Sequence, residues 1–398
     1  MTEKIFAFST IVLTSLYHWI VITILIKLNS VDEAGDYIWA LSIMSPFSVF
    51  LLLGLRQLYL SDKDDTYTIG IIIKYRFYAT LLFFIISLII ILFKSSDILV
   101  ILSVGLIKVV EMLSDIFFPI YQKQNQILRG SISQTIKILI SVFIILSFSF
   151  LGVNIFVGLI ISALVNLFLC CYDYFYIKNS YNVIFLKSEK NGIFRFFKTS
   201  VSLALTSTLH SLSTNIPRYF INAFYGNKLL VVYSTIGYFS NSIILLFNSL
   251  IDLNQIKLAE YYRSSGNKVN YTIFKIFLFS LVSILLIFLI YYNYGELLLK
   301  YASNENFIKY KYLLLFSLFP LFFDLANKLL SNWILAINKL EMQLISYFVS
   351  VIIIFCSCIY FIKYNSVQGA FIATACSGIF LILFLSLIIK RYYAKGFS

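Results

Sequence analysis

The two histidines of the chain lie in short segments that match each other. Residues 13–18 read Leu-Thr-Ser-Leu-Tyr-His, and residues 205–210 read Leu-Thr-Ser-Thr-Leu-His, at an offset of 192. Imidazole can donate hydrogen bonds to phosphate oxygens, and it changes charge between about pH 5 and 8, which permits proton coupling. His18 and His210 are therefore candidates for holding an anionic substrate. The alternative is that each makes only a structural hydrogen bond between helices.

Two short polar stripes lie inside apolar segments, and each places charged side chains on one face of a helix. The stripes are Lys108, Glu111 and Asp115, and Asp324, Asn327 and Lys328. A charge at the centre of a bilayer costs at least about 2.5–3.5 kcal/mol, so such side chains turn toward partners or a hydrated cavity. Two interpretations stay open: ion pairs within each stripe, Lys108 with Glu111 and Asp324 with Lys328, or the wall of a cavity.

The candidate residues fall into two groups by charge. Those that could hold an anionic substrate are His18, Lys108, His210, Arg218, Asn327 and Lys328. Those that could bind a coupling ion through a carboxylate are Glu111, Asp115 and Asp324. Arg218 lies near the expected end of a span, and its alternative role is to reach the aqueous interface. The five cysteines lie in apolar segments without metal-ligand spacing to a histidine, so we predict no metal site, disulfide framework or cofactor.

The composition determines which elements can position these residues. Of the 398 residues, 60% are apolar and 12% are charged, whereas soluble domains carry about 25% charged residues. Such a chain cannot cover a water-facing surface, which excludes a soluble enzyme, a disordered chain and a disulfide-rich secreted domain. No apolar segment alternates with a period of two, which argues against a membrane β-barrel. We therefore expect an all-α polytopic membrane protein.

Twelve membrane-spanning helices are predicted from the distances between charges. A helix needs about 20 apolar residues to cross the hydrocarbon layer. The interval 138–172, with the polar residues before it, is long enough for two helices at about 131–151 and 153–174, with Gly152 and Asn154 as the turn between them. Two further spans, 97–120 and 312–336, contain the polar stripes. The remaining charge-free intervals are 5–26, 37–55, 77–93, 199–217, 229–251, 276–295, 342–362 and 364–389.

The distribution of lysine and arginine predicts the orientation in the membrane. If the N-terminus is cytoplasmic, the inner segments hold 22 of these residues and the outer segments hold 8. An excess of basic residues marks the cytoplasmic side, so we expect both termini in the cytoplasm. The net charge of +13 follows mostly from this excess, and no nucleic-acid partner is implied.

An internal repeat divides the chain into two halves. Besides the histidine segments, Gly35 matches Gly226 at an offset of 191. Six spans separate the two copies, so both run in the same direction, as in a parallel repeat about an axis along the membrane normal. We expect an N-terminal six-helix bundle at 1–177, a cytoplasmic connecting loop at 178–198 and a C-terminal six-helix bundle at 199–398, around a central cleft.

The loops are too short to hold a catalytic domain. No connection exceeds about 20 residues, and the motifs of phosphate-binding loops, serine hydrolases and zinc proteases are absent. Enzymatic chemistry is therefore not expected, and transport across the membrane is the default function.

Several segments resemble a known family. Residues 35–40 read Gly-Asp-Tyr-Ile-Trp-Ala, residues 111–115 read Glu-Met-Leu-Ser-Asp, and residues 121–124 read Tyr-Gln-Lys-Gln. With its size, its twelve spans and its two halves, the whole chain resembles the bacterial oligosaccharide flippases of the Wzx type. These belong to the multidrug/oligosaccharidyl-lipid/polysaccharide exporter superfamily.

This resemblance implies a function, a location and a set of partners. The substrate would be an undecaprenyl-pyrophosphate-linked oligosaccharide, moved by alternating access across the bacterial inner membrane for O-antigen or capsule synthesis. The partners would be this lipid-linked oligosaccharide, the lipid bilayer, and the polymerase and chain-length regulator of the same pathway. Related exporters place their first and seventh helices at the cleft, which suits His18 and His210. Relatives hold the pyrophosphate with cleft cations, which are few here: Lys108 and Lys328 within spans, and Arg56 and Arg218 near span ends.

Three other functions remain as alternatives. One is a drug or metabolite antiporter of the same superfamily, coupled to protons or sodium through buried carboxylates. Another is an integral membrane glycosyltransferase or polymerase, although such enzymes usually keep a sizeable external loop. The third is a lipid II flippase, which in this superfamily usually has fourteen spans.

Overall fold

The computed structural model describes residues 2–61, 68–93, 98–181, 190–253, 269–337 and 339–394. Within these ranges every regular element is a helix. The chain divides into two compact units, residues 1–208 and 209–398, and helix α8 (Lys190–Tyr225) crosses from the first to the second. Each unit is described separately below.

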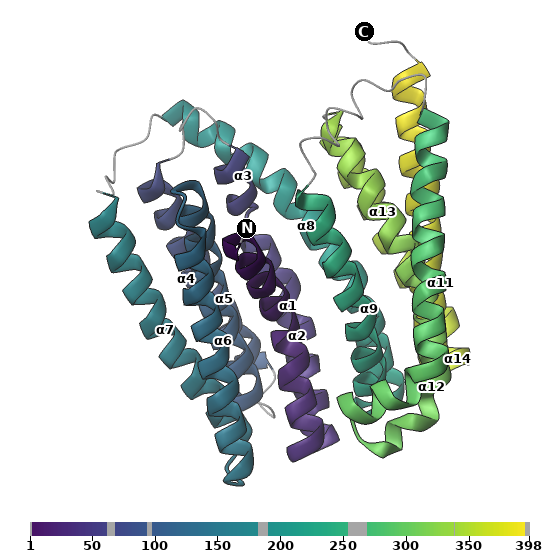
Figure 1. Ribbon diagram of the computed structural model, residues 1–398, viewed down its shortest axis with the longest axis horizontal. Helices are drawn as coiled ribbons and strands as arrows, with labels where there is room; N and C mark the ends of the chain where they lie inside the picture. Colours follow the sequence, from purple (N-terminus) through teal and green to yellow (C-terminus); the bar gives the residue numbers. More distant parts are fainter. Residues whose placement is uncertain are drawn as a thin grey trace. The chain divides into compact units, whose positions relative to one another are not determined.

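The first unit is a bundle of long helices with one short helix, α3, near its start (Figure 1). Helix α5 is central, because it packs against α2, α3, α4, α6 and α7. This position explains why a helix with three charges well inside it can cross the membrane: its polar face is turned toward neighbouring helices. The helices of this unit are α1 (Thr2–Leu28), α2 (Val31–Leu51), α3 (Leu55–Ser61), α4 (Ile69–Phe93), α5 (Ile98–Lys123), α6 (Ile127–Phe150) and α7 (Ile155–Ser180).

The second unit has the same plan. Helix α13 packs against α9, α11, α12 and α14, and it carries the second polar stripe. The central helix of each unit is thus the one with charged residues in its span. The helices of this unit after α8 are α9 (Asn227–Leu253), α11 (Val269–Ala302), the 3-10 helix η3 (Glu305–Tyr310), α12 (Lys311–Phe316), α13 (Leu318–Ala336) and α14 (Leu340–Ala394).

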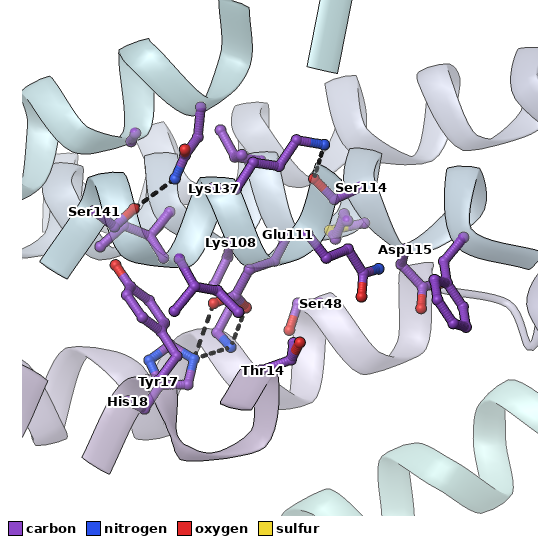
Figure 2. A pocket seen from close by; sticks show the side chains of 18 of the residues that line it. Thr14, Tyr17, His18, Ser48, Lys108, Glu111, Ser114, Asp115, Lys137 and Ser141 are labelled. Carbon is purple, nitrogen blue, oxygen red and sulfur yellow. Dashed lines mark hydrogen bonds and ion pairs between the residues drawn. The ribbon is translucent and has the colours of Figure 1, made fainter. Parts of the chain in front are cut away.

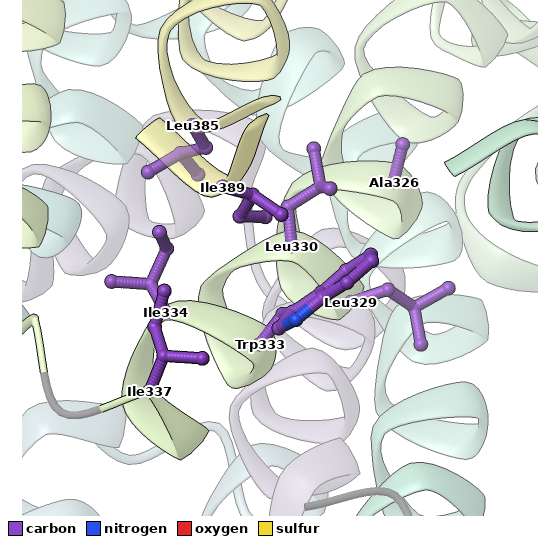
Figure 3. Packing of buried hydrophobic residues seen from close by; sticks show 8 residues of the cluster. All are labelled: Ala326, Leu329, Leu330, Trp333, Ile334, Ile337, Leu385 and Ile389. Carbon is purple, nitrogen blue, oxygen red and sulfur yellow. The ribbon is translucent and has the colours of Figure 1, made fainter. Parts of the chain in front are cut away.

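The core of the second unit is apolar where α13 meets the C-terminal part of α14 (Figure 3). Trp333 is fully buried there, and its indole Nε1 donates a hydrogen bond of 3.1 Å to the hydroxyl of Tyr393. Its neighbours in the cluster are Ala326, Leu329, Leu330, Ile334 and Ile337 of α13, with Leu385 and Ile389 of α14.

The described helices match the predicted spans one by one. Seven are long and apolar enough to cross a membrane, and α12 with α13 forms a further span bent by 44°. Helix α14 covers two predicted spans, since its backbone breaks at Ser366 with φ 50° and ψ −130°. With α5, α8 and α9, the described helices supply the twelve predicted spans. The predicted fold class, all-α with two six-helix halves, is confirmed.

The break in α14 depends on a glycine and on a tyrosine from α8. A Cβ atom on Gly369 would lie 2.0 Å from the carbonyl oxygen of Phe361, so the two halves of α14 approach each other too closely for any side chain at this position. The hydroxyl of Tyr225 lies 3.0 Å from the carbonyl oxygens of Ile362 and Lys363, to which it can donate. Carbonyl groups at the end of a helix lack partners within that helix, and Tyr225 supplies one here.

The second span differs from its predicted bounds. The charge-free interval 37–55 predicts its end at residue 55, but α2 ends at Leu51. Leu53 and Gly54 both take the left-handed conformation, with φ 53° and 58°. The chain turns there and starts the short helix α3, which brings Arg56 back against α5.

Candidate functional site

A cavity of about 430 Å³ lies inside the first unit (Figure 2). Its walls come from α1, α2, α3, α5, α6 and α7. The volume is in the range of pockets that bind small molecules, which are about 300–1,000 Å³. Of the predicted site residues, it brings together His18, Lys108, Glu111 and Asp115.

His18, Lys108 and Glu111 form one ionic cluster, which Figure 2 shows in the cavity wall. The Lys108 Nζ donates to Glu111 Oε2 at 2.7 Å and lies 3.0 Å from His18 Nε2. The same imidazole nitrogen lies 3.0 Å from Glu111 Oε1, and the Nδ1 contacts the hydroxyl of Tyr37 at 2.8 Å. The ion pair between Lys108 and Glu111 is therefore present, and it lies in the wall of a cavity. Tyr37, which no charge or spacing marked in the sequence, completes the cluster.

Asp115, the third residue of the stripe, pairs with an arginine from another helix. Arg76 of α4 is 1% exposed, and its Nη2 donates to Asp115 Oδ2 at 2.9 Å. The Nε and Nη1 of Arg76 have no hydrogen-bond partner in the described part of the chain. The count of basic residues on each side of the membrane assigned Arg76 to a cytoplasmic segment, just before the charge-free interval 77–93, whereas it lies inside α4. That assignment is wrong.

A third ion pair links α6 to α7. Lys137 Nζ donates to Asp173 Oδ2 at 2.6 Å, and both residues are buried. Ser133 also donates to Oδ2, at 2.6 Å, and the hydroxyl of Tyr121 donates to Oδ1 at 3.1 Å. Lys137 reaches the cavity wall and the hydroxyl of Ser114 at 3.4 Å.

The acidic residues of the cavity are thus neutralised. Glu111 has Lys108, Asp115 has Arg76, and the lining cation Lys137 has Asp173. The lining cation without an ion-pair partner among the described residues is Arg56, whose guanidinium lies 5.4 Å from the centre of the Phe118 ring. Such a cation–π contact holds the side chain while leaving its donors available.

The second polar stripe does not form the ion pair that its spacing allows. Asp324 has no ion-pair or hydrogen-bond partner among the described residues, and it is half-buried. The alternative that Asp324 pairs with Lys328 is therefore not supported. Asn327 is buried and donates from Nδ2 to the carbonyl of Gly378 at 3.2 Å, while its Oδ1 has no partner within the described ranges. An i, i+4 spacing permits a contact, but neighbouring helices decide which way each side chain points.

The two remaining predicted cations lie on α8. His210 is exposed, and its ring contacts Tyr347 edge-on at 5.7 Å between centroids. Arg218 Nη1 donates to Asn215 Oδ1 at 2.9 Å, and the guanidinium lies 5.6 Å from the centre of the Tyr238 ring. His18 and His210 are therefore equivalent in sequence but have different surroundings.

This difference predicts unequal effects of alanine substitution. His18→Ala removes a partner from both Tyr37 and the Lys108–Glu111 pair, and we expect it to lower the free energy of unfolding by about 1–3 kcal/mol. His210→Ala removes one edge-on ring contact and should change it by less than about 0.5 kcal/mol. Unfolding in mixed detergent and dodecyl sulfate micelles measures both. Equal effects at the two positions would contradict the contacts described.

Several proteins of known structure share this fold. The chain has a TM-score of 0.70 to an inward-facing multidrug resistance MATE transporter of the MOP superfamily, at 12% identity over 96% of each chain. To the lipid II flippase MurJ in an inward closed conformation, the score is 0.67 at 16% identity, covering 100% of this chain and 93% of MurJ. The chain therefore shares the fold of these transporters. No family model matches the sequence.

One sequence relative covers nearly the whole chain. The capsular polysaccharide biosynthesis protein CapF of Staphylococcus aureus is 27% identical over 404 residues, which is 96% of each protein. The structural neighbours in the exporter superfamily are transporters and a flippase. The chain is thus a multi-pass membrane protein of a transport fold.

Proposed function

We propose that this protein belongs to the exporter superfamily and moves an undecaprenyl-pyrophosphate-linked oligosaccharide across the bacterial inner membrane by alternating access, for capsule or O-antigen synthesis. The observation that carries the proposal is the full-length similarity to a capsular polysaccharide biosynthesis protein. The likeness to a lipid II flippase supports a lipid-linked substrate. The polymerase and chain-length regulator of the pathway are its proposed partners.

The distribution of basic residues supports an orientation with both termini in the cytoplasm, and this orientation gives Arg56 a role. With both termini cytoplasmic, α3 lies at the inner end of the first unit, at the depth where a pyrophosphate would sit in the inner leaflet. Arg56 has five N–H donors and no acidic partner in the described ranges, which suits bidentate binding of phosphate oxygens. Lys108 is tied to Glu111 and His18, and His210, Arg218, Asn327 and Lys328 of the second unit stay proposed substrate contacts.

Coupling is proposed at Asp324. This carboxylate has no cationic partner in the described part of the chain, whereas Glu111 and Asp115 each have one. A proton or sodium ion can bind a carboxylate only where no fixed cation already neutralises it. A coupling role for Glu111 or Asp115 would require their ion pairs to open during transport.

A clean deletion strain tests the function. We expect loss of surface polysaccharide and accumulation of undecaprenyl-linked oligosaccharide on the cytoplasmic leaflet, because the lipid-linked unit is completed but not moved. Mass spectrometry of extracted lipids and immunodetection of surface glycan measure the two effects, and expression of the wild-type gene should reverse both. Normal surface glycan in the deletion strain would contradict the proposal. Shortened glycans on the lipid carrier would instead indicate the alternative of a glycosyltransferase or polymerase.

A further inference from the structure

Besides Arg56, two uncharged amides offer hydrogen-bonding groups in the cavity of the first unit. Asn166 donates from Nδ2 to Ser141 at 2.6 Å, but its Oδ1 has no partner among the described residues. Gln134, one turn before Lys137 on α6, also lines the cavity and has no hydrogen-bond partner within the described ranges. Together they offer two carbonyl acceptors and one free NH₂ group to a ligand.

The charges of the cavity argue against a bound metal cation. A cation site needs several oxygen ligands that carry net negative charge, yet Glu111 and Asp115 are already neutralised by Lys108 and Arg76. Lys137 adds a further cation to the lining, paired with Asp173. A metal ion would have to displace lysine or arginine from each carboxylate.

The remaining lining suits a polar molecule without charge. Apolar side chains such as Val49, Leu52 and Ile138 alternate with the amides and with serine and threonine hydroxyls. Mostly apolar walls with a few fixed polar groups are typical of small-molecule pockets. Sugar rings combine apolar C–H faces with hydroxyls that both donate and accept, which is the chemistry that these walls complement.

The cavity extends along α5 from the position of Arg56. Lining residues of α5 run from Phe118, beside Arg56, to Lys108, ten residues further into the membrane. At 1.5 Å per residue this is about 15 Å. A glycan whose pyrophosphate contacts Arg56 could therefore extend along α5 into the cavity.

We infer that the cavity of the first unit is a glycan subsite, in which Gln134 and Asn166 hydrogen-bond to uncharged sugar rings of the transported lipid-linked oligosaccharide. The inference rests on the proposed function and names the part of the substrate that this cavity holds. The ion pairs around it shape its walls.

The test compares two lipids that differ only in their sugars. The probes are the lipid-linked oligosaccharide that accumulates in the deletion strain and sugar-free undecaprenyl pyrophosphate, each added to purified protein in nanodiscs. The Gln134→Leu and Asn166→Leu variants should each bind the glycan-bearing lipid about 5- to 10-fold more weakly, because each substitution removes one neutral hydrogen bond to the sugar. Binding of the sugar-free lipid should stay unchanged.

Two further variants serve as controls. Cys171→Leu lies on α7 near Asn166 but is exposed outside the cavity, and it should bind both lipids as the wild type does. Arg56→Gln should weaken the binding of both lipids to the same extent, because both carry the pyrophosphate. Equal thermal unfolding midpoints in nanodiscs would establish that the leucine variants are folded.

Each outcome separates the subsite from the proposed function. Suppose that wild-type protein binds the glycan-bearing lipid. If the leucine variants keep the wild-type affinity for it, or lose affinity for both lipids equally, the glycan subsite is overturned and the function stands. If wild-type protein binds neither lipid and deletion leaves surface glycan intact, the proposed function fails and the subsite fails with it. Selective loss of the glycan-bearing lipid supports both.

Discussion

Replacing Asp173 with leucine is expected to lower the free energy of unfolding by about 3–5 kcal/mol, which is the cost of leaving a buried charge without its partner. The carboxylate accepts hydrogen bonds from Lys137, Ser133 and Tyr121, and it is 3% exposed. Its removal leaves the Lys137 ammonium buried without a counter-charge. The effect should appear as low yield and as unfolding at a lower fraction of dodecyl sulfate in mixed micelles.

The double variant Lys137→Leu with Asp173→Leu separates lost charge balance from lost packing. With both charges gone, apolar side chains of similar size fill the space between α6 and α7, so most of the stability should return. An exposed pair gives the matched control: Lys300 and Glu305 are 2.9 Å apart with side chains 60% and 76% exposed. Glu305→Gln should change the free energy of unfolding far less than Asp173→Leu does, because water solvates and screens both exposed side chains. A double variant as unstable as Asp173→Leu alone would contradict this account.

The number and order of the spans could be predicted because a bilayer imposes a length on every apolar segment. The interval 138–172 and its turn at Gly152 and Asn154 correspond to α6 and α7, with Gly152 at φ 67°. The two spans with charges correspond to α5 and to α12 with α13. In these cases the local sequence alone sets the structure.

The charged residues at the ends of the spans were predicted less well, because their partners lie on other helices. Arg76 adjoins the charge-free interval 77–93 and was left outside that span, whereas Lys137 and Asp173 lie inside the predicted spans 131–151 and 153–174, for which no ion pair was predicted. All three are buried within helices. A charge can continue a membrane helix when an opposite charge on another helix meets it, and that partner is 36 to 39 residues away in these pairs. Spacing along the chain does not reveal such a partner.

The candidate site was predicted in part for the same reason. Lys108 and Glu111 are three residues apart on one helix, and their pair could be expected from sequence. The contact of His18 with that pair joins α1 to α5 across 90 residues, so only the packing of the bundle establishes it. The short helix α3, which brings Arg56 to the cavity, depends on the left-handed turn at Leu53 and Gly54.

The pair of Arg76 and Asp115 leads to an asymmetric prediction. Asp115→Leu leaves a guanidinium that is 1% exposed without its acid, and we expect a loss of about 3–5 kcal/mol in the free energy of unfolding. Arg76→Met leaves a carboxylate that is 26% exposed and lines the cavity, where water can solvate it. Its cost should therefore be smaller, about 1–3 kcal/mol. Unfolding of the two single variants in mixed micelles compares these values directly.

The double variant Arg76→Met with Asp115→Leu then decides what this carboxylate does. If Asp115 serves only to neutralise Arg76, the double variant should fold with most of the wild-type stability and restore surface polysaccharide to the deletion strain. A coupling ligand could not be replaced in this way, because leucine binds neither a proton nor a sodium ion. A double variant that folds but leaves the surface without glycan would therefore assign Asp115 to transport itself. The ion pair would then have to open during each cycle, and the cation released from Asp115 would be the deeply buried Arg76.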